Sequence, residues 1–186
     1  MGSARDFIPR ACLLGSAPVN RTLILTAAAP ALLAALLAAP AIARDPLGMF
    51  AGWGAFRDAS VPRCYAIAMA QPSTMQRDYQ PYASVGSWPR RNLRGQLHFR
   101  LSRRLAPASP IILTIGGARF ALVGGGGDAW AADRRMDAAI VAAMRSAGSM
   151  AVSAKGADGH GFSNTWPLAG AATAMDAAAI GCARIR

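Results

Sequence analysis

The sequence has no glutamate and almost no lysine. All nine acidic residues are aspartates, Lys155 is the only lysine, and arginine makes up the rest of the 20 basic residues. The formal net charge is +11. A basic chain of this kind can meet nucleic acid, anionic lipid or a polyanionic glycan. Because arginine and alanine enrichment also reflects coding bias, charge alone does not choose between these partners.

Residue types that carry out chemistry are also scarce. The two histidines, His98 and His160, and the three cysteines show no paired spacing of metal ligands. Ser163 and Asp158 flank His160 within one predicted hairpin turn, where a catalytic triad does not easily form. The glycine run 124–127 lacks the GK[ST] of a phosphate loop and the spaced glycines of a dinucleotide fingerprint. We therefore predict a flexible loop there, and no catalytic residue, metal ligand or cofactor.

An uncharged apolar run near the N-terminus predicts export. It covers residues 22–39, follows Arg21, and ends in the small-x-small pattern of residues 41–43 before charge resumes. This is the layout of a secretory signal peptide. The alternative is a retained membrane anchor, since residues 22–43 are long enough to cross a bilayer. Two prolines and a high alanine content make the run a poor anchor.

The predicted signal peptide, residues 1–43, sets the compartment of the rest. Residues 1–18 make the stretch before the apolar run unusually long for a signal peptide, which suggests that translation starts at Val19. Cleavage near Ala43 leaves residues 44–186 as a single β-rich domain, periplasmic or associated with the outer membrane. The membrane is then met only through the signal segment or a surface contact, and nucleic acid is not an expected partner.

Alternation of bulky and small or polar residues, with turn residues between, predicts most of the strands. Gly116-Gly117 joins two of them in the two-residue loop typical of a type I′ or II′ hairpin. Trp130 ends a further short strand. The predicted strands are residues 52–56, 63–70, 82–88, 95–102, 111–115, 118–123, 150–154 and 162–166.

Two helices complete the predicted fold. Asp133 is a candidate N-cap for a helix over residues 134–147, whose apolar stripe is followed by Gly148 as the C′ residue. A second helix covers about residues 171–182. We therefore expect a mainly β, antiparallel, β-sandwich-like domain of eight or nine strands in two packed sheets, with one internal helix and one C-terminal helix.

The C-terminal half carries a pattern of its own. An Asp-initiated helix covers Asp137–Gly148, a hairpin covers Met150–Pro167 and leads into Leu168 and Gly170, and Met175-Asp176-Ala177 follows in a helix. With the Gly-Gly hairpin and the early Trp53, this resembles the invasion-associated locus B family of exported alphaproteobacterial proteins. The resemblance implies a β-rich periplasmic or outer-membrane-associated domain. Many members carry additional cysteines, so it does not fix a disulfide pairing.

Cys64 and Cys182 are the two cysteines left after signal cleavage. Cys64 lies on the small-residue face of strand 63–70, and Cys182 lies on the Met175 and Ala179 side of the last helix. Both faces are expected to point inward, so we predict a disulfide, which an oxidising compartment permits. Two buried thiols or a reactive thiol are the alternatives.

Six arginines lie close together in the middle of the chain and form the strongest surface signal. They are either a solvated arginine-rich face or a patch that contacts anions, which in the periplasm means lipid head groups, lipopolysaccharide or glycans. The six are Arg90, Arg91, Arg94, Arg100, Arg103 and Arg104.

Taken together, these patterns favour a non-enzymatic exported envelope protein that binds or organises a partner, such as another envelope protein. The alternative is a periplasmic module for a small ligand or an anionic glycan or lipid. An envelope hydrolase is the third hypothesis, and a convergent acid and base in a deep pocket would be needed to raise it.

Overall fold

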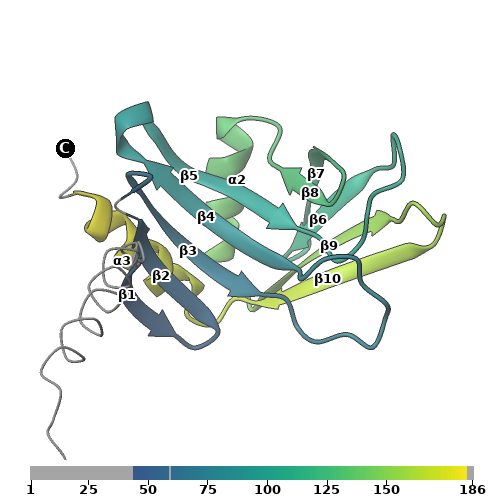
Figure 1. Ribbon diagram of the computed structural model, residues 1–186, viewed down its shortest axis with the longest axis horizontal. Helices are drawn as coiled ribbons and strands as arrows, with labels where there is room; N and C mark the ends of the chain where they lie inside the picture. The colour runs from purple at the N-terminus through teal and green to yellow at the C-terminus, as the bar shows by residue number, and fades with distance from the viewer. Residues whose placement is uncertain (1–43, 59, 184–186) are drawn as a thin grey trace, which may run out of the picture. The chain divides into compact units, whose positions relative to one another are not determined.

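A computed structural model describes residues 44–58 and 60–183. The predicted signal peptide, residues 1–43, and the proposed start at Val19 lie outside the described residues. Within the described part of the chain, strands dominate and two α-helices accompany them (Figure 1). None of the helices in this part is long and apolar enough to cross a membrane.

The strands of the described residues form one antiparallel sheet in the order β1-β2-β3-β4-β5-β8-β7-β6-β9-β10. A 3-10 turn, η1, separates β4 from β5. The prediction of a mainly β, antiparallel domain with one internal and one C-terminal helix is confirmed. The elements are β1 (Asp45–Phe50), β2 (Trp53–Asp58), β3 (Arg63–Met69), β4 (Tyr82–Trp88), η1 (Pro89–Arg91), β5 (Leu93–Arg100), β6 (Ile111–Ile115), β7 (Ala118–Gly125), β8 (Asp128–Trp130), α2 (Arg134–Met144), β9 (Ser149–Lys155), β10 (Gly161–Pro167) and α3 (Ala171–Ala183).

The sheet bends so that its two halves face each other. The ring of Phe99 on β5 packs against that of Trp166 on β10, with centroids 5.3 Å apart. Beyond the end of β3, the Gln71 N–H donates to the Thr165 carbonyl at 2.8 Å. Two separate sheets were expected, but β8 pairs with both β5 and β7 and joins the halves into one ladder. The arrangement is sandwich-like without a break in hydrogen bonding.

The described residues contain ten strands, rather than eight or nine, because β1 has no alternating pattern to predict it. It begins at Asp45, next to the predicted cleavage site, and carries Pro46 and Gly48. Proline and glycine weaken a central strand but are tolerated at a sheet edge, where β1 lies. Its register with β2 shifts between Pro46 and Gly48, as in a β-bulge.

The small face of β3 lets a helix approach the sheet closely. Cys64, Ala66 and Ala68 are buried, whereas Met69 on the opposite face is 47% exposed. The alanine-rich helix α3 packs over β1, β2, β3 and β4 on this inner face (Figure 1). The small side chains on both surfaces therefore explain why α3 covers this half of the sheet.

Helix α2 covers β5 and β6, and two aspartates at its start have different roles: Asp133 caps the helix and Asp137 joins it to the sheet. The Asp133 carboxylate accepts from the Met136 N–H at 2.8 Å, which confirms it as the N-cap. The Asp137 carboxylate, one turn later, accepts from the backbone N–H of Leu97 on β5, also at 2.8 Å. Burial raises the pKa of Asp137. The helix ends at Met144, earlier than the predicted residue 147.

Candidate functional site: an apolar pocket between two helices

A pocket of about 470 Å³ lies between α2, α3 and the inner face of the sheet. Cavities of 300–1,000 Å³ are the usual size of small-ligand sites. The lining comes from β4 and the η1 turn, the start of β5, the second half of α2, and the second half of α3. The residues are Val85, Ser87, Pro89, Leu93, Arg94, Gly95, Val141, Arg145, Met175, Ala178, Ala179, Cys182 and Ala183.

The walls of this pocket, called the interhelical pocket below, are apolar and mostly small. Val141 of α2 and Met175 and Ala178 of α3 all line the cavity. Gly95 of β5, with a positive φ of 66°, lies at the sheet side and has no side chain to fill the space. The cavity exists because glycine and alanine stand where larger side chains would close the gap between helix and sheet.

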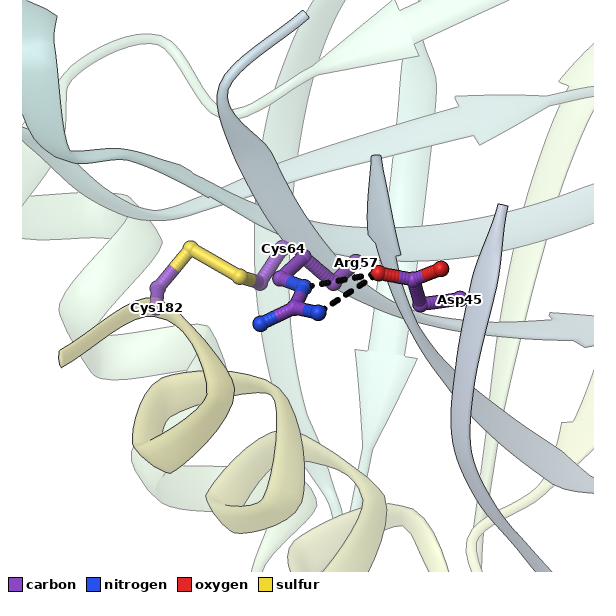
Figure 2. Close-up of polar contacts among 4 residues, drawn as sticks. All are labelled: Asp45, Arg57, Cys64 and Cys182. Carbon is purple, nitrogen blue, oxygen red and sulfur yellow. Dashed lines mark hydrogen bonds and ion pairs between the residues drawn. A yellow bond between two sulfur atoms is a disulfide. The ribbon is translucent and has the colours of Figure 1, made fainter. Parts of the chain in front are cut away.

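The disulfide reaches the pocket through one of its two cysteines. Cys64 of β3 and Cys182 of α3 are bonded, with Cα atoms 5.6 Å apart, which confirms the predicted crosslink. Figure 2 shows the bond reaching from the sheet to the last turn of α3. Both residues are almost fully buried, and Cys182 also lines the pocket. A disulfide is consistent with an oxidising compartment outside the cytoplasm.

An ion pair strengthens the sheet edge near the disulfide. Arg57 of β2 donates from Nε and Nη2 to one carboxylate oxygen of Asp45 on β1, at 3.0 and 2.6 Å (Figure 2). Both side chains are more than a third exposed, so the pair contributes only about 0.2–1 kcal/mol. Its role is to hold the edge strand in register beside the strand that α3 covers.

Arginines line the side of the pocket formed by β5 and the end of α2. Arg94 and Arg145 line it, and both also line an adjoining hollow of about 340 Å³ together with Arg134. Arg145 donates to both oxygens of Asp176 on α3, at 2.6 and 3.2 Å, and this contact lowers the pKa of Asp176. Within residues 44–58 and 60–183, neither Arg94 nor Arg134 forms an ion pair.

The six arginines considered as a candidate anion patch fall into two groups, one at each end of β5. Arg90 and Arg91 lie on η1, and Arg94 is the second residue of β5. Six residues later, about 20 Å away at the rise of a strand, Arg100 ends it. Arg103 and Arg104 follow in the loop at that far end.

The two groups differ in their charge partners. At the far end of β5, Arg100 forms an ion pair with Asp128, and Arg103 forms one with Asp158. The Arg104 backbone N–H donates to Asp78 at 2.8 Å. Only the first group, through Arg94, reaches the interhelical pocket. The arginines at the far end are therefore placed mainly to hold loops and strands together.

The two histidines lie apart from the pocket. His98 stacks on Trp130 of β8, with centroids 5.2 Å apart, and its Nε2 lies 3.0 Å from Asp128. His160 is exposed in the β9–β10 turn, where its N–H donates to Asp158. The Ser163 hydroxyl lies on the following strand and contacts Ser153 instead. The structure does not bring His160, Asp158 and Ser163 together in a triad.

The sequence did not reveal the interhelical pocket. It placed Met175, Ala179 and Cys182 on one side of the last helix, and that side does line the pocket. The sequence feature that could have indicated the pocket is the excess of alanine on that side of the helix, because alanine side chains are too small to fill the space above a sheet. Comparisons with models of known protein families, with curated proteins and with solved structures find no match for this chain.

Proposed function

We propose that this chain is an exported, non-enzymatic envelope protein that binds a small apolar molecule in the interhelical pocket. One observation carries the proposal: a cavity of about 470 Å³ between α2, α3 and the sheet, with walls that are largely apolar. Apolar cavities of this size release bound water and bury most of the surface of a drug-sized ligand. We therefore favour the binding of a small ligand over the organisation of a partner.

Export is supported by two features. The segment 1–43 has the layout of a signal peptide, so the mature domain is expected to begin after Ala43, in the periplasm or at the outer membrane. The Cys64–Cys182 bond persists most readily in such an oxidising compartment. The resemblance to the invasion-associated locus B family points the same way, and membership of that family is part of the proposal.

Binding is proposed rather than catalysis because of the polar groups that line the pocket. Besides backbone groups they are the arginines and Ser87, whose hydroxyl accepts the Gly95 N–H at 3.1 Å. Arginine is always charged and holds anions, but it is a poor general acid or base at neutral pH. The pocket is suited to hold a ligand in place.

The test is binding of Nile red, a neutral dye that fluoresces in apolar surroundings, to the mature domain. Ala179 is exposed at the pocket side of α3, so Ala179→Trp fills the cavity without disturbing the core. Ile180, 67% exposed and outside the lining, provides the matched control Ile180→Trp. We expect the wild type and Ile180→Trp to bind the dye and Ala179→Trp to bind at least tenfold more weakly. Equal binding by all three proteins would refute the pocket as the site.

A further inference from the structure

We infer that the ligand of the interhelical pocket is a single-chain amphiphile with an anionic head group, and that Arg94 is its principal charge contact. This inference rests on the proposed function and names the chemistry of the ligand. It is carried by the way the charged and apolar residues are distributed around the cavity.

The cavity is polar on one side and apolar on the other. The adjoining hollow shares Arg94, Gly95, Val141 and Arg145 with the pocket, so the two spaces meet where β5 lies against α2. On the α3 side the lining consists of Met175, small alanines and Cys182. A ligand that fills both spaces therefore needs a charged end toward α2 and an apolar end toward α3 and the disulfide.

The charged side favours an anion. Three arginines, Arg94, Arg134 and Arg145, line the pocket or its adjoining hollow, and no aspartate lines either space. Asp176 partly neutralises Arg145 from outside the lining. Arg94 lines both spaces and forms no ion pair within the described residues. A planar guanidinium in this position is suited to a phosphate or carboxylate.

Two further aspartates near the charged side already accept hydrogen bonds from the backbone. Asp133 and Asp137 line a third hollow, of about 360 Å³, together with Arg94 and Arg134. The Asp133 carboxylate caps α2, and the Asp137 carboxylate accepts the Leu97 N–H. Both are thus directed at backbone donors, which leaves the guanidinium groups of Arg94 and Arg134 available to an external anion.

The experiment compares ligands that share a chain and differ in the head group. Dodecyl phosphate, dodecylphosphocholine and dodecyl maltoside are titrated below their micelle concentrations, with displacement of Nile red and isothermal calorimetry as the measurements. Inorganic phosphate is a fourth ligand that has the charge and lacks the chain. We expect dodecyl phosphate to bind at least tenfold more tightly than dodecyl maltoside, and the difference to shrink with added salt.

Variants of exposed arginines locate the charge contact. Arg94→Ala is expected to remove the preference for dodecyl phosphate and leave dodecyl maltoside binding unchanged, and Arg94→Lys to retain part of the preference. Arg119 is exposed and lies outside the lining of the pocket and its hollows, so Arg119→Ala is the matched control. Circular dichroism checks that each variant is folded. A preference that survives Arg94→Ala would overturn the assignment of Arg94.

The other outcomes separate this inference from the proposed function. Equal affinity for all three amphiphiles would overturn the anionic head group and leave the pocket as an apolar site. Inorganic phosphate that binds as tightly as dodecyl phosphate would show an anion site that needs no chain, and would overturn the amphiphile. Binding of no amphiphile and no dye would overturn both, as would a dimer that forms with rising concentration and excludes the dye.

Discussion

Cys182 is bonded to Cys64 and lines the interhelical pocket at the same time. The crosslink therefore does two things: it fastens the last turn of α3 to β3, and it sets the position of one wall of the cavity. We therefore expect stability and the proposed ligand binding to be linked through this one bond.

Loss of the disulfide should lower stability strongly. The bonded cysteines are 118 residues apart in sequence, and closing a loop of that length stabilises a fold by about 4–5 kcal/mol on the chain-entropy model. We expect the double variant Cys64→Ser, Cys182→Ser to unfold at a much lower guanidinium concentration and to bind Nile red more weakly. The control is a thiol count on the unreduced mature protein, where two free thiols would contradict the bond.

Asp137 should be needed to join α2 to the sheet. Its carboxylate is the acceptor for the Leu97 N–H, and Leu97 is fully buried. Asp137→Ala leaves that donor without a partner, which costs about 1–3 kcal/mol. Asp137→Asn keeps an acceptor of the same shape and should cost less. Urea unfolding of the two variants at neutral pH checks this order, and an alanine variant as stable as the asparagine variant would show that the hydrogen bond contributes little.

The same residue should leave a mark on the pH dependence of stability. Burial raises the pKa of Asp137 in the folded state, so the native protein binds this proton more readily than the unfolded chain does. The stabilisation that this protonated carboxyl gives the fold is fully present below the unfolded pKa of about 3.9. It is lost as the pH rises through the higher pKa of the folded state. The unfolding free energy of the wild type should therefore decrease over this pH range, and that of Asp137→Asn should lack the part of the decrease that is due to Asp137. Parallel pH profiles for the wild type and the variant would contradict the shift.

Gly170 should tolerate no side chain. It has a positive φ of 82°, and a Cβ there would overlap the carbonyl oxygen of Phe50 on β1. Gly117, in the β6–β7 turn, also has a positive φ but has open space around it. Gly117→Ala should cost about 1–2 kcal/mol from backbone strain alone, and Gly170→Ala should cost clearly more. Equal losses in thermal unfolding would mean that the Phe50 contact relaxes easily.

Processing of the N-terminus can be measured directly. Mass spectrometry of the mature protein from a secreting host should find Arg44 as the first residue, since cleavage is predicted after Ala43. Precursor trapped before cleavage should begin at position 19. A mature chain that retains residues 22–43 would indicate a membrane anchor, and a precursor peptide containing Arg10 would contradict the start at Val19.

Much of the fold was predictable because local rules and tertiary packing agree. The Gly116-Gly117 turn has positive φ at both glycines, as a type I′ hairpin requires, and Asp133 caps α2 as its position suggested. The alternation along β3 correctly put Cys64 on the inner side, beneath the last helix. Edge strand β1 was missed because its proline and glycine are permitted by its place in the sheet, which local sequence does not show.

The pocket was harder to predict because it depends on the distance between elements. No periodicity indicates that Val141 of α2 and Met175 of α3 line the same cavity. The arginine cluster was visible in the sequence, but β5 separates its two ends, and only Arg94 joins the pocket. Arg134 and Arg145, which complete the charged side, are some 40–50 residues further on, at the start of α2 and directly after its end.

The most direct test of the account is a crystal structure of the mature domain with dodecyl phosphate. The account predicts that the alkyl chain lies between α2 and α3 in contact with Val141 and Met175, and that the phosphate contacts Arg94. A chain bound at another surface, or a collapsed pocket with Val141 packed against Met175 and no ligand, would contradict it.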